Sequence, residues 1–145
     1  MSATEDPYGL QRFEDAQRGT FEVALTELRA GRKQSHWMWF IFPQISGLGF
    51  SPMAQRYAIS AIQEARAYLQ HPVLGARLLE CTRAVNSHAG ASAREIFGPP
   101  DDVKFRSSMT LFGQAGPEEV EFRKALDTFF AGQGDARTLD KLRSK

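Results

Sequence analysis

The chain has 145 residues, of which 42% are hydrophobic and 24% are charged, and its formal net charge is +1. These proportions are ordinary for one globular domain with a sizeable core. The balanced charge offers no basic excess for nucleic acid or an anionic membrane surface, so we expect neither partner. The single cysteine, Cys81, excludes an intrachain disulfide framework and a metal cluster built on cysteines.

The first nine residues are polar and have neither the charged nor the apolar region of a secretory signal. We therefore expect residues 1–9 to form a flexible tail, residues 10–145 to form one domain, and the protein to be cytoplasmic. The longest apolar run, residues 37–42, is too short to cross a membrane.

Hydrophobic spacing predicts helices in the first third of the chain. Residues 10–17 form a short helix, and Thr20 begins a second that ends at Gly31, with apolar residues at i, i+3, i+4 and i+7. Residues 36–42, which Ser35 could cap, are an apolar run without a readable period, so a buried strand also fits. No second strand-like run can pair with it, and we therefore expect a helix.

The rest of the chain continues this pattern. A glycine-rich loop at residues 46–52 precedes an amphipathic helix at residues 53–69, and another helix follows Pro72. Ser92 and Glu95 have the spacing of a capping box. Further helices are expected at residues 103–112 after Asp101 or Asp102, from Pro117 to Phe130, and as one or two frayed turns from Thr138. The prediction is an all-α, single compact domain of about seven or eight helices.

Residues 31–44 carry most of the chemical information. They contain both tryptophans, one of the three histidines and a basic pair. Indole and imidazole N–H groups need partners when buried, so this segment is either an aromatic core element or the wall of a pocket. His36 is the best single candidate for acid–base chemistry, although a structural histidine bonded to a carbonyl fits the pattern too. A place at a helix C-terminus, where cations complement the helix dipole, suffices to explain Arg32 and Lys33; the sharper alternative is a site for an anionic or aromatic ligand.

The start of the helix at residues 103–112 is a second candidate for anion binding. Its free N–H groups and Lys104 favour an anion, whereas Asp101 and Asp102 oppose one and instead suggest a capped helix. The hydroxyl of Ser108 lies among apolar residues, where bonding to a preceding carbonyl is common. The three histidines lie 35 and 17 residues apart, without metal-ligand spacing, and we expect neither a metal nor a cofactor.

The strings FEDAQRGTFEVALTELRAGRKQSHWMWFIFPQISGLG, SPMAQRYAI, HPVLGARL and IFGPPDDVKFRSSMTLF resemble a bacterial family of small single-domain proteins of unknown function. The resemblance covers about residues 10–130 and implies an all-helical fold, but it transfers no catalytic residue. Genome annotation often gives members of this family the name calpastatin. That inhibitor is a long, disordered chain of low hydrophobicity. Because this chain has regular apolar stripes and 11% aromatic residues, we reject the label.

A second resemblance concerns the order of the strings RFEDAQ, ARAYLQHPVLGARLLECT and REIFG. This layout is similar to a family associated with the breakdown of ADP-ribose-type and riboflavin-pathway intermediates. The matching residues are mostly of structural types, and Phe97 stands where that family has tryptophan.

These observations favour a pocket for a small anionic, nucleotide-like ligand. The residues expected to bind the ligand are Arg32, Lys33, Trp37, Trp39, Gln44, Lys104 and Ser108. If the protein is an enzyme, hydrolysis of a glycosidic bond would suit, with His36 or Asp102 moving the proton. The alternative is a non-catalytic interaction module that binds a partner through the tryptophan-rich segment. A third interpretation makes that segment core and places the function on another surface.

Overall fold

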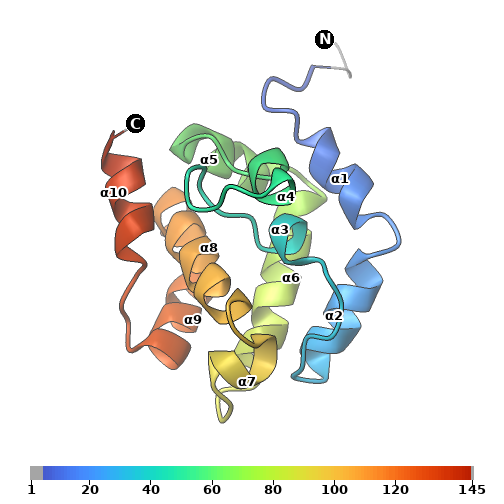
Figure 1. Ribbon diagram of the computed structural model, residues 1–145, viewed down its shortest axis with the longest axis vertical. Helices are drawn as coiled ribbons and strands as arrows, with labels where there is room; N and C mark the ends of the chain where they lie inside the picture. The colour runs from blue at the N-terminus through green and yellow to red at the C-terminus, as the bar shows by residue number, and fades with distance from the viewer. Residues whose placement is uncertain (1–4, 145) are drawn as a thin grey trace.

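The computed structural model describes residues 5–144, which contain ten helices (Figure 1). They are α1 (Gln11–Gln17), α2 (Phe21–Arg29), α3 (Met38–Ile41), α4 (Pro52–Arg56), α5 (Ile62–Gln70), α6 (Leu74–Asn86), α7 (Ala93–Phe97), α8 (Asp101–Ala115), α9 (Val120–Phe130) and α10 (Ala136–Ser144). Residues 5–144 contain no strand, only an isolated β-bridge between Ile45 and Ile59. The all-α prediction is confirmed. The tail expected at residues 1–9 lies partly outside the described residues, which exclude 1–4.

The helix α8 occupies the centre of the bundle, packed against α5, α7, α9 and α10 (Figure 1). It has little amphipathic character because most of its circumference is covered, and it buries every residue from 107 to 112. Phe105 stacks on Phe97 with ring centroids 4.7 Å apart and meets Phe42 edge-on at 5.0 Å. This aromatic cluster joins the α3 segment to α7 and α8.

Two buried polar networks hold α1 against its neighbours. The side-chain amide of Gln17 donates to the carbonyl of Phe40 at 2.7 Å and to the hydroxyl of Tyr68 at 3.1 Å. The guanidinium of Arg12 donates to the carbonyl of Ala58 at 2.8 Å and to the carboxylate of Glu64 at 2.9 Å. Because Glu64 is almost fully buried, this ion pair fixes the segment between α4 and α5 against α1.

The prediction of one continuous helix at residues 53–69 is wrong, because an extended segment separates α4 from α5. The N–H of Ile59 donates to the carbonyl of Gln44 at 2.8 Å, and the N–H of Ser46 donates to the carbonyl of Ile59 at 2.8 Å. Ser60 then donates through its N–H and hydroxyl to Glu64. These long-range bonds outweigh local helical periodicity. With the other short helices, this break raises the count from the expected seven or eight to ten within residues 5–144.

Local signals elsewhere have mixed outcomes. The capping box of Ser92 and Glu95 is confirmed at the start of α7. Ser35 does not cap α3, because its hydroxyl donates to Glu27 instead and the helix begins at Met38. Cys81 is buried in the core as expected, and burial raises the pKa of its thiol to about 12.

One glycine sets how closely two helices approach. Gly75 lies in the first turn of α6, where a Cβ would overlap the carbonyl oxygen of Leu69 in α5. Any other residue would therefore push α6 away from α5. No helix within residues 5–144 has the length and apolar character needed to cross a membrane.

Candidate functional site

The tryptophan-rich segment is anchored by one carboxylate, that of Glu27 on α2. It accepts hydrogen bonds from the N–H of Gln34 at 2.8 Å, the N–H of Ser35 at 2.9 Å, the hydroxyl of Ser35, and the indole N–H of Trp37 at 2.9 Å. Burial raises the pKa of Glu27, but the hydrogen bonds from Ser35, Gln34 and Trp37 outweigh burial and lower it to about 2. Trp37 itself is completely buried.

Asp101, at the start of α8, joins two lysines that each lie over a tryptophan. Its carboxylate is 2.8 Å from the ammonium of Lys33 and 3.5 Å from that of Lys104. The ammonium of Lys33 lies 5.1 Å from the ring centre of Trp37, and that of Lys104 lies 5.4 Å from the ring centre of Trp39. Both distances are within cation–π range. The side chain of Lys33 is only 8% exposed, whereas that of Lys104 is 30% exposed.

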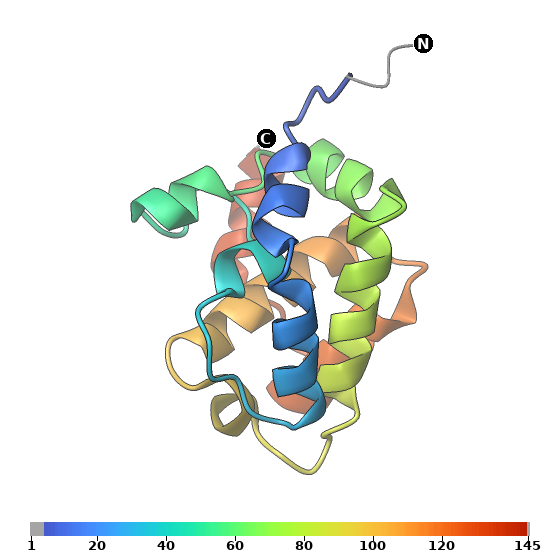
Figure 2. The same ribbon diagram turned by 90° about the vertical axis from the view of Figure 1, so that its right-hand side faces the viewer.

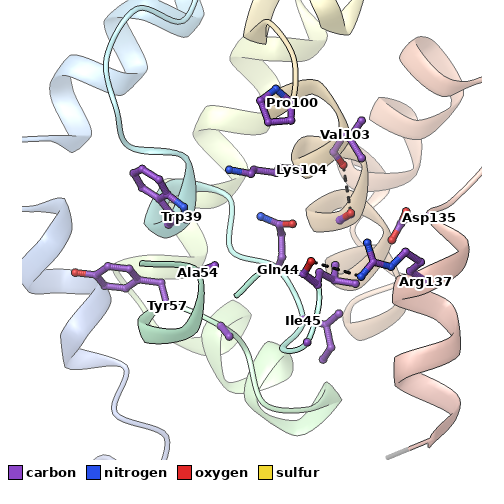
Figure 3. Close-up of a pocket in the computed structure, with 15 residues that line it drawn as sticks. Trp39, Gln44, Ile45, Ala54, Tyr57, Pro100, Val103, Lys104, Asp135 and Arg137 are labelled. Atoms are coloured by element: carbon purple, nitrogen blue, oxygen red, sulfur yellow. Dashed lines mark hydrogen bonds between the residues drawn. The ribbon is translucent and has the colours of Figure 1, made fainter. Parts of the chain in front are cut away.

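Beside Trp39 lies a cavity of about 200 Å³, between the loop that joins α3 to α4 and the first turns of α8 (Figure 3). Its side-chain wall combines aromatic, charged and polar groups from Trp39, Gln44, Tyr57, Lys104, Ser107, Asp135 and Arg137. In Figure 3, Trp39 lies on one side, Arg137 and Asp135 lie on the other, and Gln44 and Lys104 lie between them.

The polar groups of the cavity are only partly engaged within the protein. Ser107 donates its hydroxyl to the carbonyl of Val103 at 3.2 Å. The guanidinium of Arg137 donates to the carbonyl of Leu48 over a long 3.5 Å. One carboxylate oxygen of Asp135 accepts the N–H of Thr138 at 2.9 Å and its hydroxyl at 2.6 Å. The cavity therefore has cationic donors with hydrogen-bonding capacity to spare.

The loop wall of the cavity is positioned by contacts from distant parts of the chain. The Ile45–Ile59 bridge fixes its two ends, and the Arg12 network holds the segment around Ala58. Gly47 adopts a φ of +94°, and a Cβ there would lie 2.8 Å from the ammonium nitrogen of Lys141 on α10. The start of the loop thus lies against α10, the segment after α4 is bonded to α1, and α4 itself projects from the body (Figure 2).

A family model described as "Protein of unknown function (DUF1810)" matches residues 7–142. The chain belongs to this family. The crystal structure at 1.38 Å of the conserved hypothetical protein Rv1873 from Mycobacterium tuberculosis is similar to it, with 53% sequence identity and a TM-score of 0.94 over 95% of this chain and 99% of that one. No curated protein matches the chain. The first resemblance is therefore confirmed. The family description assigns no activity, and it does not mention calpain inhibition.

In this DUF1810 chain, the structure brings only some of the predicted site residues to the cavity. Trp39, Gln44 and Lys104 line it. Lys33 and Trp37 do not line it: they form an interior pair, bonded to Asp101 and Glu27.

The remaining predicted residues lie outside the lining. Arg32 and His36 are exposed on the loop between α2 and α3. Ser108 is completely buried, and its hydroxyl has no hydrogen-bond partner among the described residues. Asp102 accepts the N–H of Val103 at 2.9 Å and stands between two lining residues, Pro100 and Val103.

Sequence reasoning missed several lining residues. Asp135 and Arg137 come from the far end of the chain, in a stretch without motif or aromatic residues. Tyr57 was hidden within a predicted helix. Ser107 carried a usable signal, because it belongs to the cluster of hydroxyls among apolar residues on α8. No group of three or more metal-binding side chains occurs within residues 5–144.

Proposed function

We propose that the cavity beside Trp39 binds a small anionic, nucleotide-like ligand. One observation carries this proposal: a partly exposed indole, an ammonium and a guanidinium border the same concave space, from Trp39, Lys104 and Arg137. An indole offers a stacking surface for a base or a sugar ring, and the two cations suit a phosphate. Lys104 also pairs with Asp101 at 3.5 Å, whereas Arg137 makes no ion pair within residues 5–144.

The proposal divides the predicted residues by role. Trp39, Gln44 and Lys104 would contact the ligand, together with Arg137. Lys33 and Trp37 would support the site from behind, through Asp101 and Glu27. Arg32, His36 and Ser108 do not line the cavity and so would have no direct part in binding.

Hydrolysis of a glycosidic bond is the reaction we propose for such a ligand. It needs an acid that protonates the leaving group while water attacks the sugar carbon. Neither of the two predicted proton carriers lines the cavity, but Asp102 is the better placed, because Pro100, Val103 and Lys104 near it in the chain line the cavity, whereas His36 lies on the exposed loop between α2 and α3. Incubation with adenosine monophosphate, followed by chromatography, would show adenine and ribose 5-phosphate with the wild type and neither product with Asp102→Asn. Product at the wild-type rate from Asp102→Asn would contradict this assignment.

The interaction-module alternative receives less support from the burial of the segment. It needs exposed tryptophans as anchors, yet Trp37 is completely buried and Trp39 is only partly exposed.

A thermal-shift screen with nucleotides, ADP-ribose and sugar phosphates tests the binding proposal. A ligand at a hundred times its dissociation constant adds about 2.7 kcal/mol, which gives a clear rise in Tm. We expect Trp39→Ala and Arg137→Ala to abolish the rise. Arg143→Ala is the matched control, because Arg143 lies on the same helix and pairs only with exposed Asp140 among the described residues. No rise with any ligand, or a rise that survives both cavity variants, would contradict the proposal.

A further inference from the structure

The far end of the cavity contains opposite charges that do not neutralise each other. Asp135 and Arg137 both line it, yet no ion pair joins them in the described part of the chain. One oxygen of Asp135 is occupied by Thr138, while the other has no hydrogen-bond partner in residues 5–144. Within the described residues, the guanidinium of Arg137 makes only its long bond to Leu48. A ligand that satisfies both groups must present an anion and a hydrogen-bond donor side by side.

The size of the cavity limits the ligand further. Its volume of about 200 Å³ is below the roughly 300–1,000 Å³ typical of pockets that enclose a drug-sized molecule. A dinucleotide would therefore lie mostly outside. The enclosed part can hold one ring and one charged group.

We propose that the enclosed part of the ligand is a sugar phosphate monoester, an inference that rests on the proposed function and narrows it. The phosphate dianion lies between Lys104 and Arg137, which together supply two positive charges. The sugar hydroxyls donate to the unengaged oxygen of Asp135, at the end of the cavity opposite Trp39. Gln44, between the two ends in Figure 3, can bond a hydroxyl or a phosphate oxygen.

This assignment distinguishes between ligand classes. A second phosphate next to the first would face the carboxylate of Asp135 and be repelled. An α-amino acid would satisfy Asp135 and Arg137, but its one carboxylate would leave Lys104 paired with Asp101 alone. Inorganic phosphate would use both cations, yet it would bring negative charge against Asp135 and offer no sugar hydroxyl.

The test compares ribose 5-phosphate with inorganic phosphate on the wild type and on Asp135→Asn, by isothermal titration calorimetry. Asparagine caps a helix as well as aspartate does, so α10 keeps its N-terminal bonds. We expect Asp135→Asn to weaken ribose 5-phosphate about tenfold, the value of one hydrogen bond to a charged group. Inorganic phosphate should bind several-fold more tightly, because a repelling charge is gone. The control Asp140→Asn, an exposed change on α10, should alter neither the affinity for ribose 5-phosphate nor that for inorganic phosphate.

Opposite shifts for the two ligands support the sugar phosphate. Shifts in the same direction would overturn it, because a general cationic patch responds equally to both ligands. Binding of adenosine monophosphate without binding of ribose 5-phosphate would also overturn it, while leaving the nucleotide-like ligand of the proposed function intact. If no phosphate compound binds, the proposed function fails as well.

Discussion

Trp37 and Trp39 are two residues apart and lie in opposite surroundings. Each has a lysine ammonium over its ring, and both lysines pair with Asp101. Trp37 is fully buried and donates its indole N–H to Glu27, whereas Trp39 is partly exposed and lines the cavity. The same arrangement of aromatic ring, cation and carboxylate thus serves the core on one side and borders an open site on the other.

The backbone explains how neighbours can differ so much. Trp37 precedes α3 and Trp39 lies within its single turn, where residues two apart point in different directions. Glu27 then fixes which ring enters the core, because its carboxylate collects the N–H groups of the loop together with the indole N–H. The hydrogen bonds to Glu27, and not a difference in hydrophobicity, therefore determine that Trp37 is buried while Trp39 borders the cavity.

Replacing each tryptophan by alanine gives the largest expected contrast. Trp37→Ala should lower the free energy of unfolding by about 3–5 kcal/mol, because it empties a fully buried site. Trp39→Ala should cost less than about 2 kcal/mol, since its ring is partly solvated already. Urea denaturation followed by circular dichroism measures both values. Equal losses would show that the two rings are not divided between core and site.

Removing the Glu27 carboxylate should lower the free energy of unfolding nearly as much as Trp37→Ala does. Glu27→Ala leaves buried donors of Ser35 and Trp37 without their acceptor, and we expect a loss of about 3 kcal/mol in unfolding free energy. Glu27→Gln, which keeps one acceptor oxygen, should lose less. The control is Glu22→Ala, an exposed change on the same helix. If Glu27→Ala lowers the unfolding free energy no more than Glu22→Ala does, Glu27 does not hold the tryptophan-rich segment in place.

Acid should weaken the same anchor selectively. The pKa of Glu27 falls from its ordinary 4.5 to about 2 on folding, so the unfolded chain binds more protons between these values. Its stabilising contribution is therefore complete above about pH 4.5 and is lost as the pH falls towards 2. The stability difference between wild type and Glu27→Gln, measured by denaturation at pH 7, 4 and 3, should shrink in that order. A difference independent of pH would contradict the low pKa.

The two lysines give the smallest and most specific contrast. Lys104→Met keeps an apolar stem over Trp39 and removes the charge, so it should weaken binding of adenosine monophosphate about tenfold. Lys33→Met makes the same change over Trp37 and should leave the affinity unchanged while lowering the unfolding free energy by about 1–2 kcal/mol. Calorimetry and denaturation on both variants measure these effects. Equal changes in affinity would place the ligand elsewhere.

The fold could be predicted where the causes are local. Periodic apolar residues predict α2 and α6, and the Ser92–Glu95 spacing predicts the start of α7. The break between α4 and α5 could not be predicted, because it depends on Ile59 meeting Gln44 and on Arg12 reaching Ala58. Those bonds exist only once distant segments are packed.

The candidate site also contains some residues that the sequence could predict and others that it could not. Trp39 and Lys104 were predicted from residue type, since aromatic and basic groups stand out in a sequence. Asp135 and Arg137 were missed because only the folded chain brings α10 against the loop after α3. The different fates of the two tryptophans were equally hidden, because a continuous apolar run has no period from which to choose the buried ring.

Single-tryptophan fluorescence tests the central claim most directly. Trp37→Phe leaves Trp39 as the one indole of the chain, and Trp39→Phe leaves Trp37. Titration with adenosine monophosphate should change the emission of Trp37→Phe with the dissociation constant found by calorimetry, and should leave Trp39→Phe unchanged. An unchanged emission from Trp39, or a response from buried Trp37 alone, would contradict a ligand site beside Trp39.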